Sequence, residues 1–248
     1  MGIERREHEG FLELRLDRAD KKNALTGAMY DTLTAALKEA GERPDIAAVM
    51  LAGNGGVFTA GNDIKDFLAP NGAVPAFHFI HAIAASAKPI VAAVQGMAVG
   101  IGTTMLFHCD LVYAAPGTRF LVPFTSLGIV PEAASSLLMP ARMGYAKAAE
   151  MLLLGQPIDV EAAERGGIIT AIVPADALEE HARAKARALA AMPPEALAAT
   201  RKLMRGDRTA IDAQMAAEAT AFAKAMKSAE AKEAFTAFLE KRPPNFKR

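Results

Sequence analysis

The sequence contains a single cysteine and no excess of charge of either sign. Cys109 alone cannot form an intramolecular disulfide or a thiolate metal cluster. The 28 lysines and arginines equal the 28 aspartates and glutamates, whereas a nucleic-acid-binding protein usually has a basic excess or stripe. His78 and His81 are spaced to share one face of a helix, but no third metal ligand follows at a suitable spacing. We therefore expect no nucleic-acid partner and no metal site.

The sequence also lacks a long apolar run. A membrane-spanning helix needs about eighteen or more consecutive apolar residues, and the longest apolar stretch, residues 89–106, is interrupted by Gln95 and by glycines. The charged N-terminal residues are not followed by the apolar segment of a secretion signal. The last residues are not the Ser-Lys-Leu address of peroxisomal proteins. We expect no membrane insertion and a cytoplasmic location.

The composition is that of a globular protein, with 52% hydrophobic and 23% charged residues. The first predicted strand alternates apolar and polar side chains and should be half buried, whereas the later ones are continuous apolar runs typical of buried strands. Strands that alternate with helices predict a parallel-rich α/β sheet covered on both faces. The predicted strands cover residues 11–16, 46–52, 89–95 and 110–115, and the predicted helices between them cover residues 26–40, 74–86 and 102–108.

After Ile172-Val173-Pro174 the strand pattern stops, and only helical patterns follow. Ser228 is placed to cap the last of these helices, and Pro243-Pro244 prevents that helix from continuing. The segment Met192-Pro193-Pro194 is the best boundary, and it predicts an α/β body over residues 1–191 and a helical C-terminal region over residues 192–248. The predicted C-terminal helices cover residues 177–191, 195–205, 210–227 and 228–242.

Three turns at the starts of expected helices could contribute chemistry. They lie at residues 58–65, 95–102 and 127–136. Glycine lets the backbone bend and lets a ligand approach its N–H groups, and the first N–H groups of a helix have no partner within the helix. Two such turns directed at one point could stabilise an oxyanion. Each turn by itself is equally explained as a simple connection between a strand and a helix.

Taken together and in this order, the segments resemble the crotonase (enoyl-CoA hydratase/isomerase) superfamily. The resemblance extends along the whole chain. It rests on Asn23-Ala24-Leu25, Ala60-Gly61-Asn62-Asp63-Ile64, residues 96–102, residues 109–114, residues 162–173 and residues 237–246. It implies a spiral of ββα units, a C-terminal helical region that builds a homotrimer or a dimer of trimers, and an acyl-CoA substrate. Coenzyme A would be part of that substrate, and no further cofactor is expected.

The resemblance also assigns roles to individual positions. The backbone N–H groups of Asn62 and Ile101 match the oxyanion hole of the family, so their side-chain identities do not affect this role. Lys241 matches a residue that binds phosphate, which could belong to another subunit. The positions expected to contact the substrate are Ala24, Ala60, Gly61, Asp63, Ile64, Lys65, Met97, Gly100, Phe124 and Lys241.

The type of reaction depends on carboxylates. Hydratases of this family use two glutamates to activate water, and this sequence has Thr104 and Phe124 at the matching positions. Neither side chain can act as a general acid or base near neutral pH. Glu132 is the remaining family-matched acid or base, and with Asn62-Asp63 it resembles the Δ3,Δ2-enoyl-CoA isomerases.

In such an isomerase one glutamate would take a proton from C2 of a 3-enoyl thioester and return it at C4, through a dienolate. The neighbours of Glu132 are apolar, so we expect burial to raise its pKa. The peroxisomal isomerases have serine and glycine where this chain has Ala60 and Ala133, which leaves the subtype open.

Several alternatives remain at this point. Glu132 could merely be an acidic residue in the first turn of a helix, where the helix dipole favours it. The protein could be a hydratase whose water is held by other groups, or a non-catalytic member of the family that binds RNA or a protein. A short-chain dehydrogenase is disfavoured, because Lys does not follow Tyr30, Tyr113 or Tyr145 by four residues.

Overall fold

The computed structural model describes residues 2–246. Its main sheet has six strands in the order β1-β2-β3-β4-β6-β8, and β1 alone is antiparallel to its neighbour. A second, parallel sheet consists of two short strands, β5 and β7. The strands are β1 (Ile3–His8), β2 (Phe11–Leu16), β3 (Ala48–Gly53), β4 (Ile90–Val94), β5 (Met97–Val99), β6 (Leu111–Ala114), β7 (Arg119–Leu121) and β8 (Ala171–Ile172).

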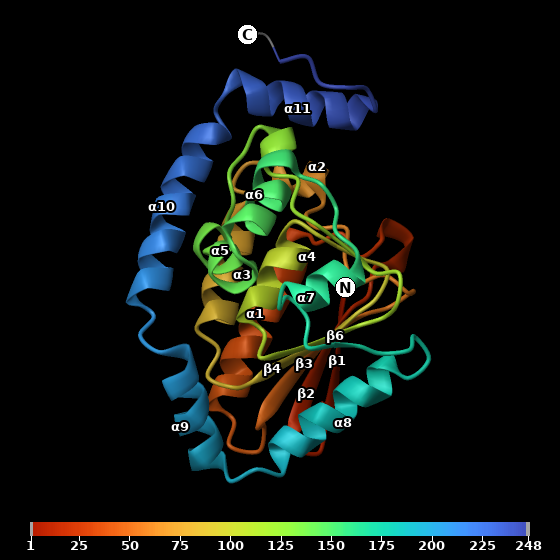
Figure 1. The fold of residues 1–248 in the computed structure, drawn as a ribbon, viewed down its shortest axis with the longest axis vertical. Coiled ribbons are helices and arrows are strands. Elements are labelled where there is room, and N and C mark those ends of the chain that lie inside the picture. Colours follow the sequence, from red (N-terminus) through yellow and green to blue (C-terminus); the bar gives the residue numbers. More distant parts are fainter. Residues whose placement is uncertain (1, 247–248) are drawn as a thin grey trace.

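Helices cover both faces of the main sheet (Figure 1). On one face, α1 (Gly27–Glu42) and α3 (Val74–Ala84) pack on the large hydrophobic core. On the other face, α8 (Leu178–Ala190) lies against β3 and β4 and closes a smaller core. The expectation of a parallel-rich α/β sheet buried on both faces is therefore confirmed.

The strand Phe11–Leu16 is present, but the expectation that it is half buried was wrong. All six of its residues are buried, because α8 covers the face with the polar side chains. Glu13 there is completely buried and accepts hydrogen bonds from Arg15 at 2.7 Å and from Arg183 of α8 at 3.0 Å. An alternating pattern identifies the two faces of a strand, but a compensated charge network allows the polar face to be buried as well.

The helix expected over residues 102–108 is a four-residue helix, α4 (Ile101–Thr104), followed by a 3-10 turn, η2 (Met105–His108). The N-terminal cap of α1 is Thr26, as predicted, and its hydroxyl accepts a hydrogen bond from Met29 N. The sequence patterns did not reveal β1, β5 and β7. Of three helices in the middle of the chain, they indicated only the start of the first, at residues 127–136, and did not reveal the other two. These helices are α5 (Ser135–Met143), α6 (Tyr145–Leu154) and α7 (Val160–Arg165).

The C-terminal helices follow as predicted. They are α9 (Pro194–Arg205), α10 (Thr209–Ala225) and α11 (Ala229–Glu240), with Ser228 as the cap of α11. In Figure 1, α9 and α10 run along one side of the molecule and α11 crosses one end. Contacts place α10 beside α5, and α11 beside η3 (Thr125–Leu127). The predicted boundary after residue 191 falls in the connection between α8 and α9.

The part of the chain described here contains no helix that is both long and apolar enough to span a membrane. Within residues 2–246, no group of three or more His, Cys, Asp or Glu side chains is arranged to hold a metal ion. Cys109 is buried, and burial raises the pKa of its thiol to about 12.

Candidate active site

The first two glycine-containing turns lie side by side. Thr59 pairs with Ala98 in an isolated bridge, with hydrogen bonds from Thr59 N to Met97 O at 3.0 Å and from Val99 N to Thr59 O at 3.1 Å. The approach is so close that a Cβ atom on Gly61 would lie 2.8 Å from Val99 O. Glycine at position 61 therefore lets the two turns meet.

The two expected oxyanion donors follow directly after these glycines. Gly100 has φ 55° and ψ −119°, a conformation that strongly favours glycine. Its N–H donates to Leu121 O at 2.8 Å, and its carbonyl accepts from Thr103 N and Thr104 N, which fixes the turn that presents Ile101. Within residues 2–246, the N–H groups of Asn62 and Ile101 donate no hydrogen bond. Both donors are thus available to an oxygen of a ligand.

The side chain of Asn62 is held by Tyr30 of α1. The buried hydroxyl of Tyr30 donates to Asn62 Oδ1 at 2.6 Å. Burial, and secondarily the charge of Glu132, raises the pKa of Tyr30 well above its usual value, so this phenol remains a donor. The backbone on either side of Asn62 is fixed by two bonds to Leu25, from Leu25 N to Gly61 O and from Asp63 N to Leu25 O, both 2.8 Å. The role of Tyr30 was not predicted from the sequence.

Glu132 is buried, with 7% of its surface exposed. The hydroxyl of Thr104 donates to Glu132 Oε1 at 2.6 Å. Glu132 Oε2 is also buried and has no hydrogen-bond partner among the described residues. One oxygen of the carboxylate is therefore fixed by a donor, and the other is free to exchange a proton.

Burial raises the pKa of Glu132 to about 8, the hydrogen bond from Thr104 opposes this shift, and the nearby carboxylate of Glu218 adds to it. The shift agrees with the expectation from the apolar neighbours. A carboxyl group with a pKa near the working pH can both accept and return a proton, as general acid–base catalysis requires.

Two contacts bring Glu132 close to the oxyanion donors. Thr104, which binds its carboxylate, lies in the same short helix as Ile101. Tyr30, whose pKa responds to the charge of Glu132, binds the side chain of Asn62. The structure thus gathers the three residues that were predicted to be catalytic into one site.

Glu132 does not lie in the first turn of a helix, so that alternative was wrong. Helix α5 begins at Ser135, and the two intervening residues, Ala133 and Ala134, have left-handed backbones with φ 60° and 55°. We refer to residues 132–136 as the Glu132 turn. His108 contacts this turn through Nε2, which lies 2.8 Å from Ala133 O. Burial lowers the pKa of His108 to about 4, so the ring is neutral and donates this bond.

The residues expected to bind coenzyme A on the near side form one loop cluster. Ala60 N donates to Lys22 O at 2.9 Å. Arg18 joins the loop that contains Ala24 to the loop that contains Asp63, because its Nη1 donates to both Ala24 O and Asp63 Oδ2 at 2.9 Å. Asp63 also caps α2 (Ile64–Phe67), whose first two residues are Ile64 and Lys65. Arg18 begins the segment of residues 18–25 that resembles the family's first loop, but the sequence assigned it no role in the site.

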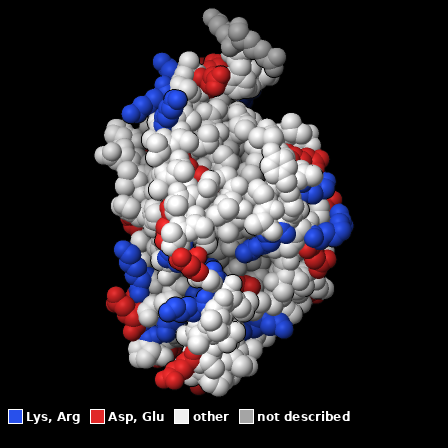
Figure 2. All heavy atoms as spheres, turned by 60° about the vertical axis from the view of Figure 1, so that its left-hand side comes forward, with Lys and Arg blue, Asp and Glu red and all other residues white. Residues whose placement is uncertain are grey.

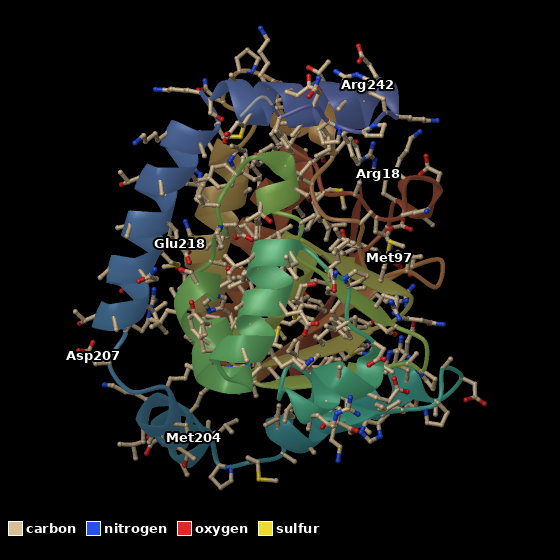
Figure 3. All side chains as sticks on the ribbon, turned by 45° about the horizontal axis from the view of Figure 1, so that its top comes forward. Arg18, Met97, Met204, Asp207, Glu218 and Arg242 are labelled. Atoms are coloured by element: carbon tan, nitrogen blue, oxygen red, sulfur yellow. The ribbon has the colours of Figure 1, made fainter. Side chains whose placement is uncertain are left out.

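The remaining expected contacts are more dispersed. Met97 lies in β5 and is partly buried, whereas Phe124 is buried at the start of η3. Lys241 follows the last residue of α11 and is exposed, and within residues 2–246 its side chain forms no ion pair. Figure 3 shows its neighbour Arg242 at the end of α11, with Arg18 and Met97 further into the molecule.

Comparison with known proteins identifies the family of the chain. The family model for enoyl-CoA hydratase/isomerase matches residues 6–248. The chain is 37% identical to a probable enoyl-CoA hydratase of Rhodobacter capsulatus, over 96% of this chain and 95% of that protein. It is 33% identical to enoyl-CoA delta isomerase 2 of Rattus norvegicus, over 94% of this chain but only 62% of the rat protein.

A solved structure gives the same result. The crystal structure of an enoyl-CoA hydratase/isomerase from Pseudoalteromonas atlantica T6c superposes with a TM-score of 0.95 and 39% identity, and the whole of both chains is covered. The α/β architecture with its mixed sheet and C-terminal helices is thus the crotonase fold. On the grounds of sequence, fold and arrangement of the site, the chain belongs to the enoyl-CoA hydratase/isomerase family of the crotonase superfamily.

Proposed function

We propose that this enzyme is an acyl-CoA isomerase that converts a 3-enoyl-CoA to a 2-enoyl-CoA. The main support is Glu132, a buried carboxylate close to two backbone N–H groups; among residues 2–246, neither these N–H groups nor Glu132 Oε2 has a hydrogen-bond partner. An isomerase needs one proton carrier and one oxyanion site, and these residues supply both.

In the first step, Glu132 Oε2 removes a proton from C2 of the thioester. The negative charge that develops on the thioester oxygen is stabilised by the N–H groups of Asn62 and Ile101, and one such donor is typically worth on the order of 10²–10³ in rate. The electron pair spreads over the C2–C4 system as a dienolate. Glu132, now protonated, returns the proton at C4, so the double bond moves and no proton is gained or lost overall.

Burial suits Glu132 for this exchange. A carboxylate with a raised pKa is a stronger base towards a carbon-bound proton, and burial raises the pKa of Glu132 to about 8. The same burial keeps bulk water away from the dienolate and protects it from protonation by solvent. The hydroxyl of Thr104 fixes the carboxylate, so that the same oxygen serves both carbons.

Hydration is the second candidate, because the relative from Rhodobacter capsulatus is described as a probable hydratase. A hydratase must hold a water molecule and activate it. The two positions where hydratases have glutamates are occupied by Thr104, whose hydroxyl is engaged with Glu132, and by the buried Phe124. Glu132 would therefore have to activate the water alone.

One experiment distinguishes the two reactions. A 3-enoyl-CoA and a 2-enoyl-CoA are supplied separately to the wild type, to Glu132→Gln and to Glu161→Gln, an exposed glutamate of α7 that serves as the control. Isomerisation by the wild type and the control, together with its loss in Glu132→Gln, supports the proposal. Wild-type hydration of the 2-enoyl-CoA that persists in Glu132→Gln would contradict it.

We further propose that the loop cluster around Ala24, Ala60 and Asp63 binds the coenzyme A portion, and that the chain forms a homotrimer or a dimer of trimers. Assembly is supported by apolar side chains on the surface, among them Leu203 and Met204 of α9, which are 83% and 82% exposed. Figure 2 shows an uncharged area over the middle and upper part of this face, with charged side chains gathered towards its lower end. Sedimentation measurements would test the assembly.

A further inference from the structure

The Glu132 turn adopts a conformation that its residues do not favour by themselves. Ala133 and Ala134 both have positive φ angles, and a left-handed backbone is unfavourable for any residue with a Cβ atom. Contacts from outside the turn must therefore maintain it. His108 supplies one such contact at Ala133 O and Thr104 another at the Glu132 carboxylate, and further contacts come from the C-terminal helix α10.

Glu218 of α10 is the main contact. Its Oε2 accepts a hydrogen bond from Ala134 N at 2.7 Å, and its Oε1 accepts one from Ser136 N at 3.0 Å and another from the Ser136 hydroxyl. Glu218 is 5% exposed. Gln214, one helical turn earlier on the same face of α10, donates to the Ser136 hydroxyl at 2.8 Å. Figure 3 shows Glu218 on the side of α10 that faces the body of the molecule.

Glu218 thus satisfies backbone N–H groups on both sides of the first residue of α5. Carboxylates are the strongest acceptors for such N–H groups at the start of a helix. These bonds fix the backbone immediately after Glu132, and through it the direction of the Glu132 side chain. The two buried carboxyls also interact electrostatically, and the charge of Glu218 contributes to the raised pKa of Glu132.

We propose that Glu218 is a positioning residue for Glu132, which holds the Glu132 turn in its left-handed conformation and so fixes the direction of the Glu132 carboxylate. The C-terminal helical region then has a part in proton transfer that is separate from any part in assembly. The expected changes in kcat and in its pH dependence rest on the proposed function, whereas the effect of Glu218 on the pKa of Glu132 does not.

The first test is Glu218→Gln, which has nearly the same shape. Whichever way the amide is oriented, its NH₂ group faces either Ala134 N–H or Ser136 N–H, so one hydrogen bond is replaced by a contact between two donors. We expect kcat to fall on the order of 10- to 100-fold, because a small displacement of a catalytic group has effects of this size. The KM should change by less than about twofold, since the coenzyme A cluster is untouched.

The pH profile provides a readout that a purely structural role would not change. Removing the negative charge of Glu218 lowers the pKa of Glu132, so the acid limb of kcat/KM should move to lower pH. Gln214→Ala is the matched control: it removes a contact of α10 with Ser136 but no charge, and its acid limb should coincide with that of the wild type. If Glu218→Gln does not fold, Ser136→Ala removes the hydroxyl that donates to Glu218 Oε1 and that lowers the pKa of Glu218. A larger fraction of Glu218 is then protonated, and the limb should shift in the same direction by a smaller amount.

A titration without substrate separates this proposal from the proposed function. The carboxyl absorption of Glu132 is identified in the infrared spectrum as the band lost in Glu132→Gln, and its pKa is compared between the wild type and Glu218→Gln. A lower pKa in Glu218→Gln supports the link even if the enzyme turns over no 3-enoyl-CoA. An unchanged pKa, with a loss of kcat that merely parallels the loss of thermal stability seen in Gln214→Ala, would overturn it.

Discussion

Replacement of Thr104 by valine tests the most specific feature of the site. The two side chains have nearly the same shape, but valine cannot donate a hydrogen bond to Glu132 Oε1, which Thr104 does at 2.6 Å in the native protein. Glu132 Oε2 already has no partner among the described residues. In Thr104→Val both oxygens of a buried carboxylate therefore lack a donor, and the ionised form becomes less stable.

The size of the effect follows from the hydrogen bond that is lost. A hydrogen bond to a charged group contributes about 1.5–3 kcal/mol, and one pKa unit corresponds to about 1.4 kcal/mol. The pKa of Glu132, about 8 in the wild type, should therefore rise by roughly one to two units. At pH 7 the reactive ionised fraction, and with it kcat/KM, should fall about 10- to 100-fold, and the loss should diminish as the pH is raised.

The assay is the pH dependence of kcat/KM, which reports the pKa of the free enzyme. Thr104→Ser keeps the hydroxyl and should retain the acid limb of the wild type. Thr103→Val is the control for a lost buried hydroxyl, because Thr103 donates to Ala98 O at 2.6 Å and does not contact Glu132. An acid limb in Thr104→Val that is unchanged, or that moves to lower pH, would refute the assigned role of this hydrogen bond.

Three further predictions concern the supports of the site and the stability of the fold. Tyr30→Phe removes the bond to Asn62 Oδ1 and should lower the free energy of unfolding, measured by urea denaturation, by about 1 kcal/mol, with a lower kcat. Gly100→Ala meets no atom within 4 Å, yet at φ 55° it should cost about 1–3 kcal/mol and lower kcat by moving the Ile101 N–H, as thermal unfolding and kinetics would show. Burial raises the pKa of Glu13, but the hydrogen bonds from Arg183 and Arg15 outweigh it and lower the pKa from 4.5 to about 2. The stabilisation should therefore be complete above pH 4.5 and be lost as the pH falls towards 2. The stability of Glu13→Gln should accordingly vary less over this range, and equal acid sensitivity would contradict that expectation.

The sequence predicted the elements of the fold that are defined by strong local patterns. Buried parallel strands are continuous apolar runs, and β3, β4 and β6 were found in this way. The edge strand β1 was missed because four of its six residues are charged, and β5 and β7 because they have only three residues each. Only the start of helix α5 was expected. Its extent was not predicted because Pro140 lies within it, and proline normally indicates the end of a helix.

The site shows the same division between local and distant information. The turns around Gly61 and Gly100 could be located from the sequence, because glycine is the usual residue where a ligand must approach a backbone N–H closely. Thr104 was noticed only as the absence of a hydratase glutamate, since nothing in a sequence shows that a hydroxyl will meet a carboxylate 28 positions away. In the structure, Thr104 donates a hydrogen bond to the carboxylate of Glu132.

Glu218 was the least predictable of these residues. In the pattern of α10 it is one more polar position, and a polar side chain on a helix is normally assigned to solvent. It is buried because the Glu132 turn offers it N–H donors at Ala134, 84 positions earlier in the chain, and at Ser136. These N–H groups are available because the two alanines before α5 are left-handed, a conformation that alanine does not suggest in a sequence. The N–H groups of the Glu132 turn thus stabilise the buried carboxylate of Glu218, and Glu218 in turn stabilises the left-handed backbone of the turn. Neither feature could be inferred from the sequence without the other.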